Sequence, residues 1–257
     1  MSSAFSEEYV AVYDLLYGDK HYRKEADFVL ARLKDVCSGS LNALLDIGCG
    51  TGTHAHCFAD HGINVQGVDI SEEMIALAIH RNDSCKTSSL VRFCQGDVRS
   101  FELPETFDAA VALFHVFSYL TQLADIETAL RQVRKHLNVG APFLFDYWYA
   151  GAILRDGVTH REREAENDNW HVHRVTDPFW DPEQDLVRVN FHVTAVKKKT
   201  GVTHSWHEEH PMRYFEPSFL EETLSRTGFK AVKHGEWLSE VAPKPGALGA
   251  YVVAIAV

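Results

Sequence analysis

The amino-acid sequence predicts an α/β fold: a doubly wound, mostly parallel sheet that carries an inserted antiparallel β-sheet and begins with a helical segment. Three observations lead to this prediction. Short apolar runs without polar alternation recur between residues 41 and 148, and segments of helical periodicity separate them. A glycine-rich turn follows the first run. Between residues 151 and 214 polar and apolar residues alternate, which is typical of antiparallel strands with one solvated face.

The elements of the parallel part follow one another at short intervals. Residues 8–37 have the apolar spacing of two helices with a break at Gly18-Asp19. LNALLDIG (41–48) is expected to be the first buried strand, and a helix from about Thr53 to His61 follows it and ends at Gly62. The following strands and helices are expected in INVQGVD (strand), SEEMIALAIHRN (helix), SLVRFCQGD and FDAAVALF (strands), IETALRQVRKHL (helix) and APFLFDYW (strand).

The remaining elements complete the sheet. Antiparallel strands are expected in THREREAEN, NWHVHRV, DLVRVNFHVTAV and VTHSWHEEHPMRYF, with a hairpin turn at Lys197–Lys199. A helix in EPSFLEETLSRTGF precedes two closing strands, and the apolar character of residues 248–257 puts the last strand inside the main sheet. We therefore expect a helical lid (1–40), an α/β core (41–150), an insertion (151–214) and a C-terminal completion of the core (215–257).

Composition excludes several classes of protein. Hydrophobic residues make up 46% and charged residues 24%, as in ordinary globular proteins. The formal net charge of −11 argues against a nucleic-acid partner. The start MSSAFSEEYV lacks the pattern of a signal peptide, and no apolar run has membrane-spanning length, so a cytoplasmic location without membrane contact is expected. The five cysteines are odd in number and scattered, which speaks against disulfides or a zinc site.

Acidic residues follow the first three strands at the sheet edge where ligands bind in such folds. Asp46 lies at the end of the first strand, Asp69 at the end of the second and Asp97 after the third. A carboxylate about 20 residues beyond a glycine turn is suited to accept hydrogen bonds from a ribose diol. Asp69 has this position, and Asp97 is suited to an exocyclic amino group such as that of adenine.

The glycine turn indicates the class of ligand. Gly48, Gly50 and Gly52 give G-x-G-x-G, but Thr53 stands where the dinucleotide fingerprint requires its third glycine. The carboxylate of Asp46 would repel a pyrophosphate and attract an ammonium group. The favoured ligand thus carries positive charge, a ribose and a base, as S-adenosylmethionine does.

The segments LLDIGCGTGTH, VQGVDISEEMIALA, CQGDVRSFELPETFDAAVALF and HLNVGAPFLFDYW together resemble the successive motifs of class I S-adenosylmethionine-dependent methyltransferases. The resemblance covers about residues 41–148 and implies a Rossmann-like seven-stranded sheet. It also implies that the cofactor contacts, from the methionine part to the adenine, are made by Asp46, Gly48, Cys49, Gly50, Gly52, Thr53, Asp69, Ile70, Met74, Asp97, Val98 and Leu113.

A narrower resemblance concerns the acceptor. VYDLLYGDKHYRKEADFV, CGTGTH, FHVFSYL and the antiparallel insertion are similar to N-methyltransferases of nucleotide-linked amino sugars. It implies an N-terminal lid whose tyrosines Tyr13, Tyr17 and Tyr22 cover the cofactor, and a small-molecule amine as acceptor. A free amine or amino acid, or a hydroxyl group, remain alternative acceptors. Candidates for binding a nucleotide diphosphate are Arg155, Arg161, Arg163, Arg174, Arg188 and Arg213.

Methyl transfer from a sulfonium chiefly requires alignment of the reacting atoms and exclusion of water. Candidates for a catalytic role follow the fourth and fifth strands: His115, Tyr119, Asp146 and Tyr147. We expect His115 to be a general base, because imidazole titrates near neutral pH, and Tyr17 to present a lid hydroxyl near the methyl group.

Competing functions are weighed against the same residues. Fifteen histidines suggest a metal, but HEEH at 207–210 lacks the H-E-x-x-H spacing, so no metal site is expected. A non-catalytic S-adenosylmethionine-binding module predicts a damaged turn or a missing ribose acid, and both are intact. A nicotinamide-dependent oxidoreductase is disfavoured by Thr53 and Asp46. The chain is expected to be a monomer or a homodimer.

Overall fold

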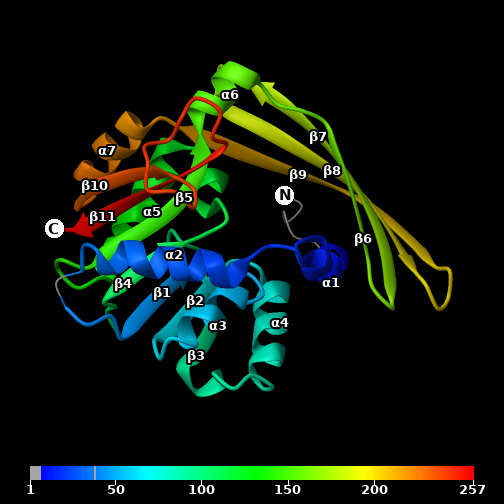
Figure 1. Ribbon diagram of the computed structural model, residues 1–257, viewed down its shortest axis with the longest axis horizontal. Coiled ribbons are helices and arrows are strands. Elements are labelled where there is room, and N and C mark those ends of the chain that lie inside the picture. The colour runs from blue at the N-terminus through cyan, green and yellow to red at the C-terminus, as the bar shows by residue number, and fades with distance from the viewer. Residues whose placement is uncertain (1–6, 38) are drawn as a thin grey trace.

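A computed structural model describes residues 7–37 and 39–257 (Figure 1). The helices are α1 (Glu7–Leu16), α2 (Tyr22–Lys34), α3 (Thr53–Ala59), α4 (Glu72–Asn82), α5 (Leu123–Lys135), α6 (Ala150–Asp156) and α7 (Pro217–Arg226), with short 3-10 turns η1 (Ser88–Leu90) and η2 (Val116–Tyr119). The strands are β1 (Ala43–Ile47), β2 (Asn64–Asp69), β3 (Val91–Gln95), β4 (Ala109–Ala112), β5 (Pro142–Tyr149), β6 (Arg161–Glu166), β7 (Trp170–Asp181), β8 (Leu186–Lys197), β9 (Thr203–Phe215), β10 (Phe229–Glu236) and β11 (Gly249–Ala256).

The central sheet confirms the predicted α/β fold class. Its strand order is β3-β2-β1-β4-β5-β11-β10, in which β1 to β5 are parallel and β11 and β10 are antiparallel to their neighbours. As expected from its apolar sequence, β11 lies between two strands, and its residues 250–254 are fully buried. Strands β2 and β3 are added on one side of β1, and β4 and β5 on the other, so the strand order switches between β1 and β4. Ligands of open α/β sheets bind at such a switch point.

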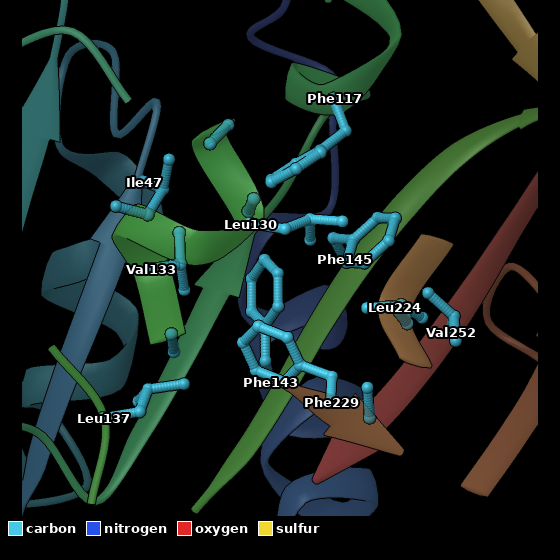
Figure 2. Packing of buried hydrophobic residues seen from close by; sticks show 14 of the residues in the cluster. Ile47, Phe117, Leu130, Val133, Leu137, Phe143, Phe145, Leu224, Phe229 and Val252 are labelled. Atoms are coloured by element: carbon cyan, nitrogen blue, oxygen red, sulfur yellow. The ribbon is translucent and has the colours of Figure 1, made fainter. Parts of the chain in front are cut away.

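Helices cover both faces of this sheet. One face packs on α2 and α3, through side chains such as Val29, Leu33 and Phe58. The other packs on α5 and α7, and Figure 2 shows Leu130 and Val133 of α5 and Leu224 of α7 against Phe143 and Phe145. Strands covered on both faces need no polar alternation, which explains the continuous apolar runs in the sequence.

The N-terminal segment divides into two parts with different roles. Although the sequence analysis assigned residues 1–40 to a lid, α2 packs on the sheet as part of the core layer. Only α1 stands apart from the sheet, and its Val12 and Leu16 pack on Val172 and Val193 of the insertion. The helix therefore lies between the insertion and the α/β core, beside α4 (Figure 1).

The insertion is a long, arching antiparallel sheet of β6 to β9 (Figure 1). It joins the central sheet where Trp148 and Tyr149 at the end of β5 pair with Tyr214 and Phe215 of β9. The Lys197–Lys199 run lies at the turn between β8 and β9, as predicted. The amide of Gly201 donates a hydrogen bond to the carbonyl of Lys197 at 2.8 Å in this turn. The sequence analysis did not foresee α6, which leads from β5 into the insertion.

Candidate functional site

A cavity of about 1090 Å³ opens at the carboxyl ends of β1, β2, β3 and β4. The central sheet contributes the glycine turn and the residues that follow each strand, and α4 contributes Met74. The tyrosines of α1 and its following segment, and inward-facing residues of β6 to β9, close the other side. The cavity therefore lies between the α/β core, α1 and the insertion.

Most of the residues proposed from the sequence meet on the wall of this cavity. Those that line it are Tyr13, Tyr17, Tyr22, Gly48, Cys49, Gly50, Thr53, Asp69, Ile70, Met74, Asp97, Val98, Leu113 and His115. Two proposed residues, Asp46 and Gly52, are absent from the wall.

The glycine turn has the left-handed backbone that its glycines allow: φ is 67° at Gly48, 54° at Gly50 and 79° at Gly52. A Cβ on Gly48 would lie 2.4 Å from Val116, and one on Gly52 would lie 2.4 Å from the ring of Phe93. A Cβ on Gly50 would meet nothing within 4 Å. Gly48 and Gly52 thus serve close packing, whereas Gly50 presents bare backbone to the cavity.

Asp46 lies behind the turn, with 2% of its surface exposed. Its Oδ2 has no hydrogen-bond partner among the residues that the structure describes. Burial, and to a lesser degree the nearby charge of Asp69, raise the pKa of Asp46 to about 8. The sequence analysis treated this side chain as a carboxylate in contact with the ligand; the structure instead has a buried acid that is protonated near neutral pH and acts from behind the turn.

Asp69 has the position expected of a ribose-binding acid. Its Oδ2 accepts a hydrogen bond from the amide of Gly50 at 2.8 Å, and its Oδ1 accepts one from the amide of Ser71 at 2.9 Å. Each carboxylate oxygen can accept further hydrogen bonds. Burial raises the pKa of this side chain, and the backbone amides oppose that effect. The carboxylate is thereby fixed in orientation at the cavity wall.

Asp97 is already paired within the chain. Nε of Arg99 donates to both of its oxygens, at 2.9 and 3.1 Å, and this guanidinium lowers the pKa of the carboxyl. Arg99 also lies on the cavity wall. An adenine amino group at Asp97 therefore has to share the carboxylate with Arg99, which the sequence analysis did not anticipate.

The lid tyrosines form an aromatic layer over the cavity. The rings of Tyr13 and Tyr17 lie 4.7 Å apart, and Tyr17 meets Phe114 edge-on at 5.0 Å. The hydroxyl of Tyr17 accepts a hydrogen bond from Nη1 of Arg174 at 2.8 Å. Tyr22 packs edge-on against His54 at 4.8 Å.

Polar contacts fasten α1 to both of its neighbours. On the core side, the carboxylate of Asp14 accepts a hydrogen bond from Thr51 Oγ1 at 3.0 Å and forms an ion pair with Arg81 of α4. On the insertion side, Asp19 pairs with Arg163 at 2.5 Å. This arrangement holds the lid closed over the cavity.

His115 is the N-cap residue of η2 and lies three positions after the end of β4. Its backbone amide donates to Asp146 Oδ1 at 2.9 Å, and its Nδ1 lies 3.1 Å from Asp146 Oδ2. Burial lowers the pKa of His115 more than the Asp146 carboxylate raises it. The imidazole is therefore neutral at pH 7, as a proton acceptor must be.

The structure also shows which other candidates reach the cavity. Tyr119, Arg161, Arg163 and Arg174 line it. Tyr147 is buried in the core instead, and the remaining arginines pair elsewhere: Arg155 with Asp156, Arg188 with Glu209 and Arg213 with Asp185.

Several lining residues were not singled out from the sequence. Phe191 of β8 and Met212 of β9 are examples. The alternation along β8 and β9 predicted that every second residue faces one side. It did not indicate which side would face a cavity.

Metal binding and membrane insertion find no support in the described part of the chain. Residues 7–37 and 39–257 contain no group of three or more His, Cys, Asp or Glu side chains that could hold a metal ion. None of their helices has both the length and the apolar character needed to span a membrane.

The residues present fit S-adenosylmethionine. Gly50 leaves open space where a side chain would stand, and Asp69 presents an oriented carboxylate beside it. The buried Oδ2 of Asp46, without a partner in the described residues, matches the positive charge of the ligand's methionine part.

Known methyltransferases resemble the chain over most of its length. Residues 44–140 match the family model of a methyltransferase domain. The chain is 27% identical over 232 residues to dTDP-3-amino-3,4,6-trideoxy-α-D-glucopyranose N,N-dimethyltransferase of Streptomyces venezuelae, covering 88% of this chain and 92% of that protein. It is 29% identical over 229 residues to dTDP-3-amino-3,6-dideoxy-α-D-glucopyranose N,N-dimethyltransferase of Streptomyces fradiae, covering 87% and 84%.

The fold has close counterparts among solved structures. The crystal structure of Streptomyces venezuelae DesVI superimposes with a TM-score of 0.80 at 24% identity and covers 96% of this chain and 98% of that one. The matched domain contains the glycine turn and the acids of the cavity wall. The chain is a class I S-adenosylmethionine-dependent methyltransferase that resembles the N-methyltransferases of nucleotide-linked amino sugars.

Proposed function

We propose that the chain methylates the amine of a nucleotide-linked amino sugar. The observation that carries this proposal is the single cavity that extends from the glycine turn to the insertion. Two relatives that align over most of the chain act on dTDP-linked amino sugars, according to their names. The volume of the cavity, about 1090 Å³, exceeds the upper end of the range for ordinary ligand pockets, about 1000 Å³. This volume accommodates a cofactor and a large acceptor together.

The cofactor end is assigned to the α/β core. Asp69 accepts hydrogen bonds from the ribose hydroxyls. The apolar walls around the base are supplied by Ile70, Met74, Val98 and Leu113. Gly48 and Cys49 flank the methionine part, and Asp46 acts on it from behind the turn. When bound, S-adenosylmethionine supplies an electrophilic methyl group on a positively charged sulfur.

The acceptor end is assigned to the insertion. Arg161, Arg163 and Arg174 bring guanidinium groups to the wall, although Arg163 also pairs with Asp19 and Glu162 lines the same wall. A diphosphate linking nucleoside and sugar is the chemical group that such guanidinium groups bind best. The acceptor amine then lies between the arginines and the core, near Tyr17 and His115.

The chain's contribution to catalysis is alignment, exclusion of water and removal of a proton. The lid, held by Asp14 and Asp19, keeps solvent from the reacting atoms. An amine must be neutral to attack, and His115, neutral and oriented by Asp146, is a candidate to accept its proton. The hydroxyl of Tyr17 is held in place by Arg174 and faces the same cavity.

A small-molecule acceptor, a cytoplasmic location and a monomeric or homodimeric state complete the proposal; the last two rest on the sequence alone. A free amine such as glycine, or a hydroxyl acceptor, is the main competitor for the acceptor role. The insertion arginines favour the nucleotide-linked acceptor, because a free amine needs no such cluster.

The experiment supplies the purified chain with S-[methyl-¹⁴C]adenosylmethionine and, separately, dTDP-3-amino-3,4,6-trideoxy-α-D-glucopyranose, the corresponding free amino sugar and glycine. We expect methyl transfer to the dTDP-linked sugar with a kcat/KM at least a hundredfold above the other two. Arg161→Gln should raise KM for the dTDP-linked sugar about tenfold, while exposed Arg155→Gln, outside the cavity, should leave it unchanged. Transfer to glycine without transfer to the dTDP-linked sugar contradicts the proposal.

A further inference from the structure

A buried hydrogen-bonded chain connects the cavity to a carboxylate of the insertion. The hydroxyl of Tyr119, at the end of η2, lies 3.0 Å from Nδ1 of His210 on β9. Nε2 of the same imidazole lies 3.1 Å from Oε2 of Glu208. The side chains of His210 and Glu208 are only 2% and 4% exposed.

The partners determine the direction of these hydrogen bonds. A carboxylate only accepts, so Nε2 of His210 carries a hydrogen and donates it to Glu208. Nδ1 is then an acceptor, and the phenol of Tyr119 donates to it. In this state Nδ1 of His210, which accepts the phenolic hydrogen, is the atom at which the imidazole can take up a proton.

The position of the three groups argues for more than a structural role. Tyr119 and His210 line the cavity, whereas Glu208 does not. Burying a carboxylate and an imidazole carries a desolvation cost that an apolar trio of similar volume avoids. The three groups connect the cavity wall to the buried carboxylate of Glu208, and this carboxylate would stabilise an imidazolium at His210.

We propose that Tyr119, His210 and Glu208 form a proton relay that converts the ammonium form of the acceptor to the neutral amine. This inference rests on the proposed amine acceptor. The acceptor's N–H bond breaks and its proton passes to the Tyr119 oxygen, while the phenolic proton passes to Nδ1 of His210. The amine keeps the electron pair that attacks the methyl group, and the proton remains on the imidazolium beside Glu208.

The charges around the relay favour this direction. Burial raises the pKa of Tyr119, and Tyr17, which follows α1, Glu208 of β9 and Asp69 of β2 raise it further. Phe191 of β8 packs on His210 with ring centroids 4.7 Å apart, and Arg174 of β7 lies on the same phenylalanine ring at 4.6 Å.

The relay differs from the His115–Asp146 pair in its surroundings. Burial and the charge of Lys20 lower the pKa of His115, which makes it a weaker acceptor for an ammonium proton. Tyr119 is the last residue of η2 and His115 is the residue before it, and both line the cavity. We therefore assign removal of the ammonium proton to the relay in place of the candidate base His115, whose position on the cavity wall suits it to align the amine.

The test compares Tyr119→Phe and His210→Gln with the wild type, using dTDP-3-amino-3,4,6-trideoxy-α-D-glucopyranose as acceptor. At pH 7 we expect each variant to lower kcat about a hundredfold, the magnitude typical of general base catalysis, and the double variant to lower it no further. At pH 9.5, where the amine is neutral in solution, the variants should come within about threefold of the wild type. Glu208→Gln should likewise lower kcat at pH 7 and come close to the wild type at pH 9.5.

The matched control is Tyr147→Phe. Tyr147 forms a second buried tyrosine–histidine pair, with its hydroxyl 3.4 Å from Nδ1 of His234, but it does not line the cavity. Its removal should leave kcat within twofold at both pH values. Equal losses at pH 7 and 9.5 for the relay variants mean that the trio only holds the structure, and they overturn the proposal.

A measurement without acceptor separates this inference from the proposed function. ¹⁵N NMR of the imidazole should show the Nε2–H tautomer of His210 in the wild type. The Nδ1–H tautomer would overturn the relay even if dTDP-linked sugars are methylated. Failure of the wild type to methylate any amine rejects the proposed function, and the relay as an amine base with it.

Discussion

Asp146 lies against His115 at two points: its Oδ1 accepts a hydrogen bond from the backbone amide at 2.9 Å, and its Oδ2 lies 3.1 Å from Nδ1. The backbone at this point is unusual, because Phe114 and His115 have φ of 71° and 64°, in the left-handed region that favours glycine. Two such residues in sequence store strain of about 1–3 kcal/mol each. The buried carboxylate stabilises a conformation that the chain would otherwise avoid, and it directs the imidazole toward the cavity.

Asp146→Ala should therefore weaken both folding and catalysis. Loss of the buried acceptor leaves the His115 amide without its partner, at a cost of about 1–3 kcal/mol in the free energy of unfolding. Asp146→Asn keeps an oxygen for this amide and should cost less. Urea denaturation measures the difference, and equal stability of the alanine variant and the wild type would contradict the account.

The protonation state of Asp46 makes a binding prediction. With a pKa raised to about 8 by burial, this side chain carries a proton at pH 7 in the free protein. A cation bound nearby favours the carboxylate, so S-adenosylmethionine should release close to one proton on binding. Isothermal titration calorimetry in buffers of different ionisation enthalpy measures the release. Asp46→Asn should abolish it, and an unchanged release in that variant would assign the proton to another group.

The same shift predicts the pH dependence of stability. Because the folded pKa of Asp46 lies above its ordinary value of 3.8, the folded state binds more protons than the unfolded state between 3.8 and about 8. Its contribution to the free energy of unfolding therefore decreases as the pH rises through this range. Asp46→Asn should reduce that decrease, as followed by urea titrations between pH 5 and 8. An identical pH slope in both proteins would contradict the shift.

Two glycines of the turn should respond differently to the same substitution. Gly48→Ala puts a Cβ 2.4 Å from Val116 in addition to its strained φ, so it should destabilise the fold by more than about 2 kcal/mol. Gly50→Ala meets no protein atom within 4 Å and should cost only about 1–2 kcal/mol. Its methyl group enters the cavity, however, and should weaken S-adenosylmethionine binding at least tenfold. Thermal denaturation and calorimetry together separate the two effects.

Much of the fold was predictable from periodicity, and the failures have local causes. The apolar runs identified β1, β2, β4, β5 and β11 because these strands are covered on both faces. Strand β7 continues through Asp177 and Pro178, residues typical of turns, because its continuous pairing with β8 overrides their local preference. Gly151 similarly obscured α6, which spans only Ala150–Asp156.

The site was predictable where spacing along the chain fixes geometry. Asp69 follows from its distance to the glycine turn, but the protonation of Asp46 depends on how the turn covers it. The contact of Tyr119 with His210 joins residues 91 positions apart. No sequence pattern predicted that contact, because it depends on how the insertion folds back over η2.

The attachment of α1 through Asp14 predicts slower exchange of the cofactor than an open cavity would allow. Asp14 joins the helix to Thr51 of the glycine turn and to Arg81 of α4. Asp14→Asn keeps a hydrogen-bond acceptor for Thr51 but loses the ion pair, which is partly exposed and worth less than about 1 kcal/mol. We therefore expect the dissociation rate of S-adenosylhomocysteine to increase about threefold, with little change in stability.

Stopped-flow displacement measures that rate, and Asp19→Asn provides the comparison. Asp19 pairs with Arg163 and is mostly exposed, so its loss weakens the attachment of the lid to the insertion but leaves the glycine turn fastened. If the lid must separate from the core for the cofactor to leave, Asp14→Asn should have the larger effect. A larger effect of Asp19→Asn would show that the cofactor leaves on the insertion side instead.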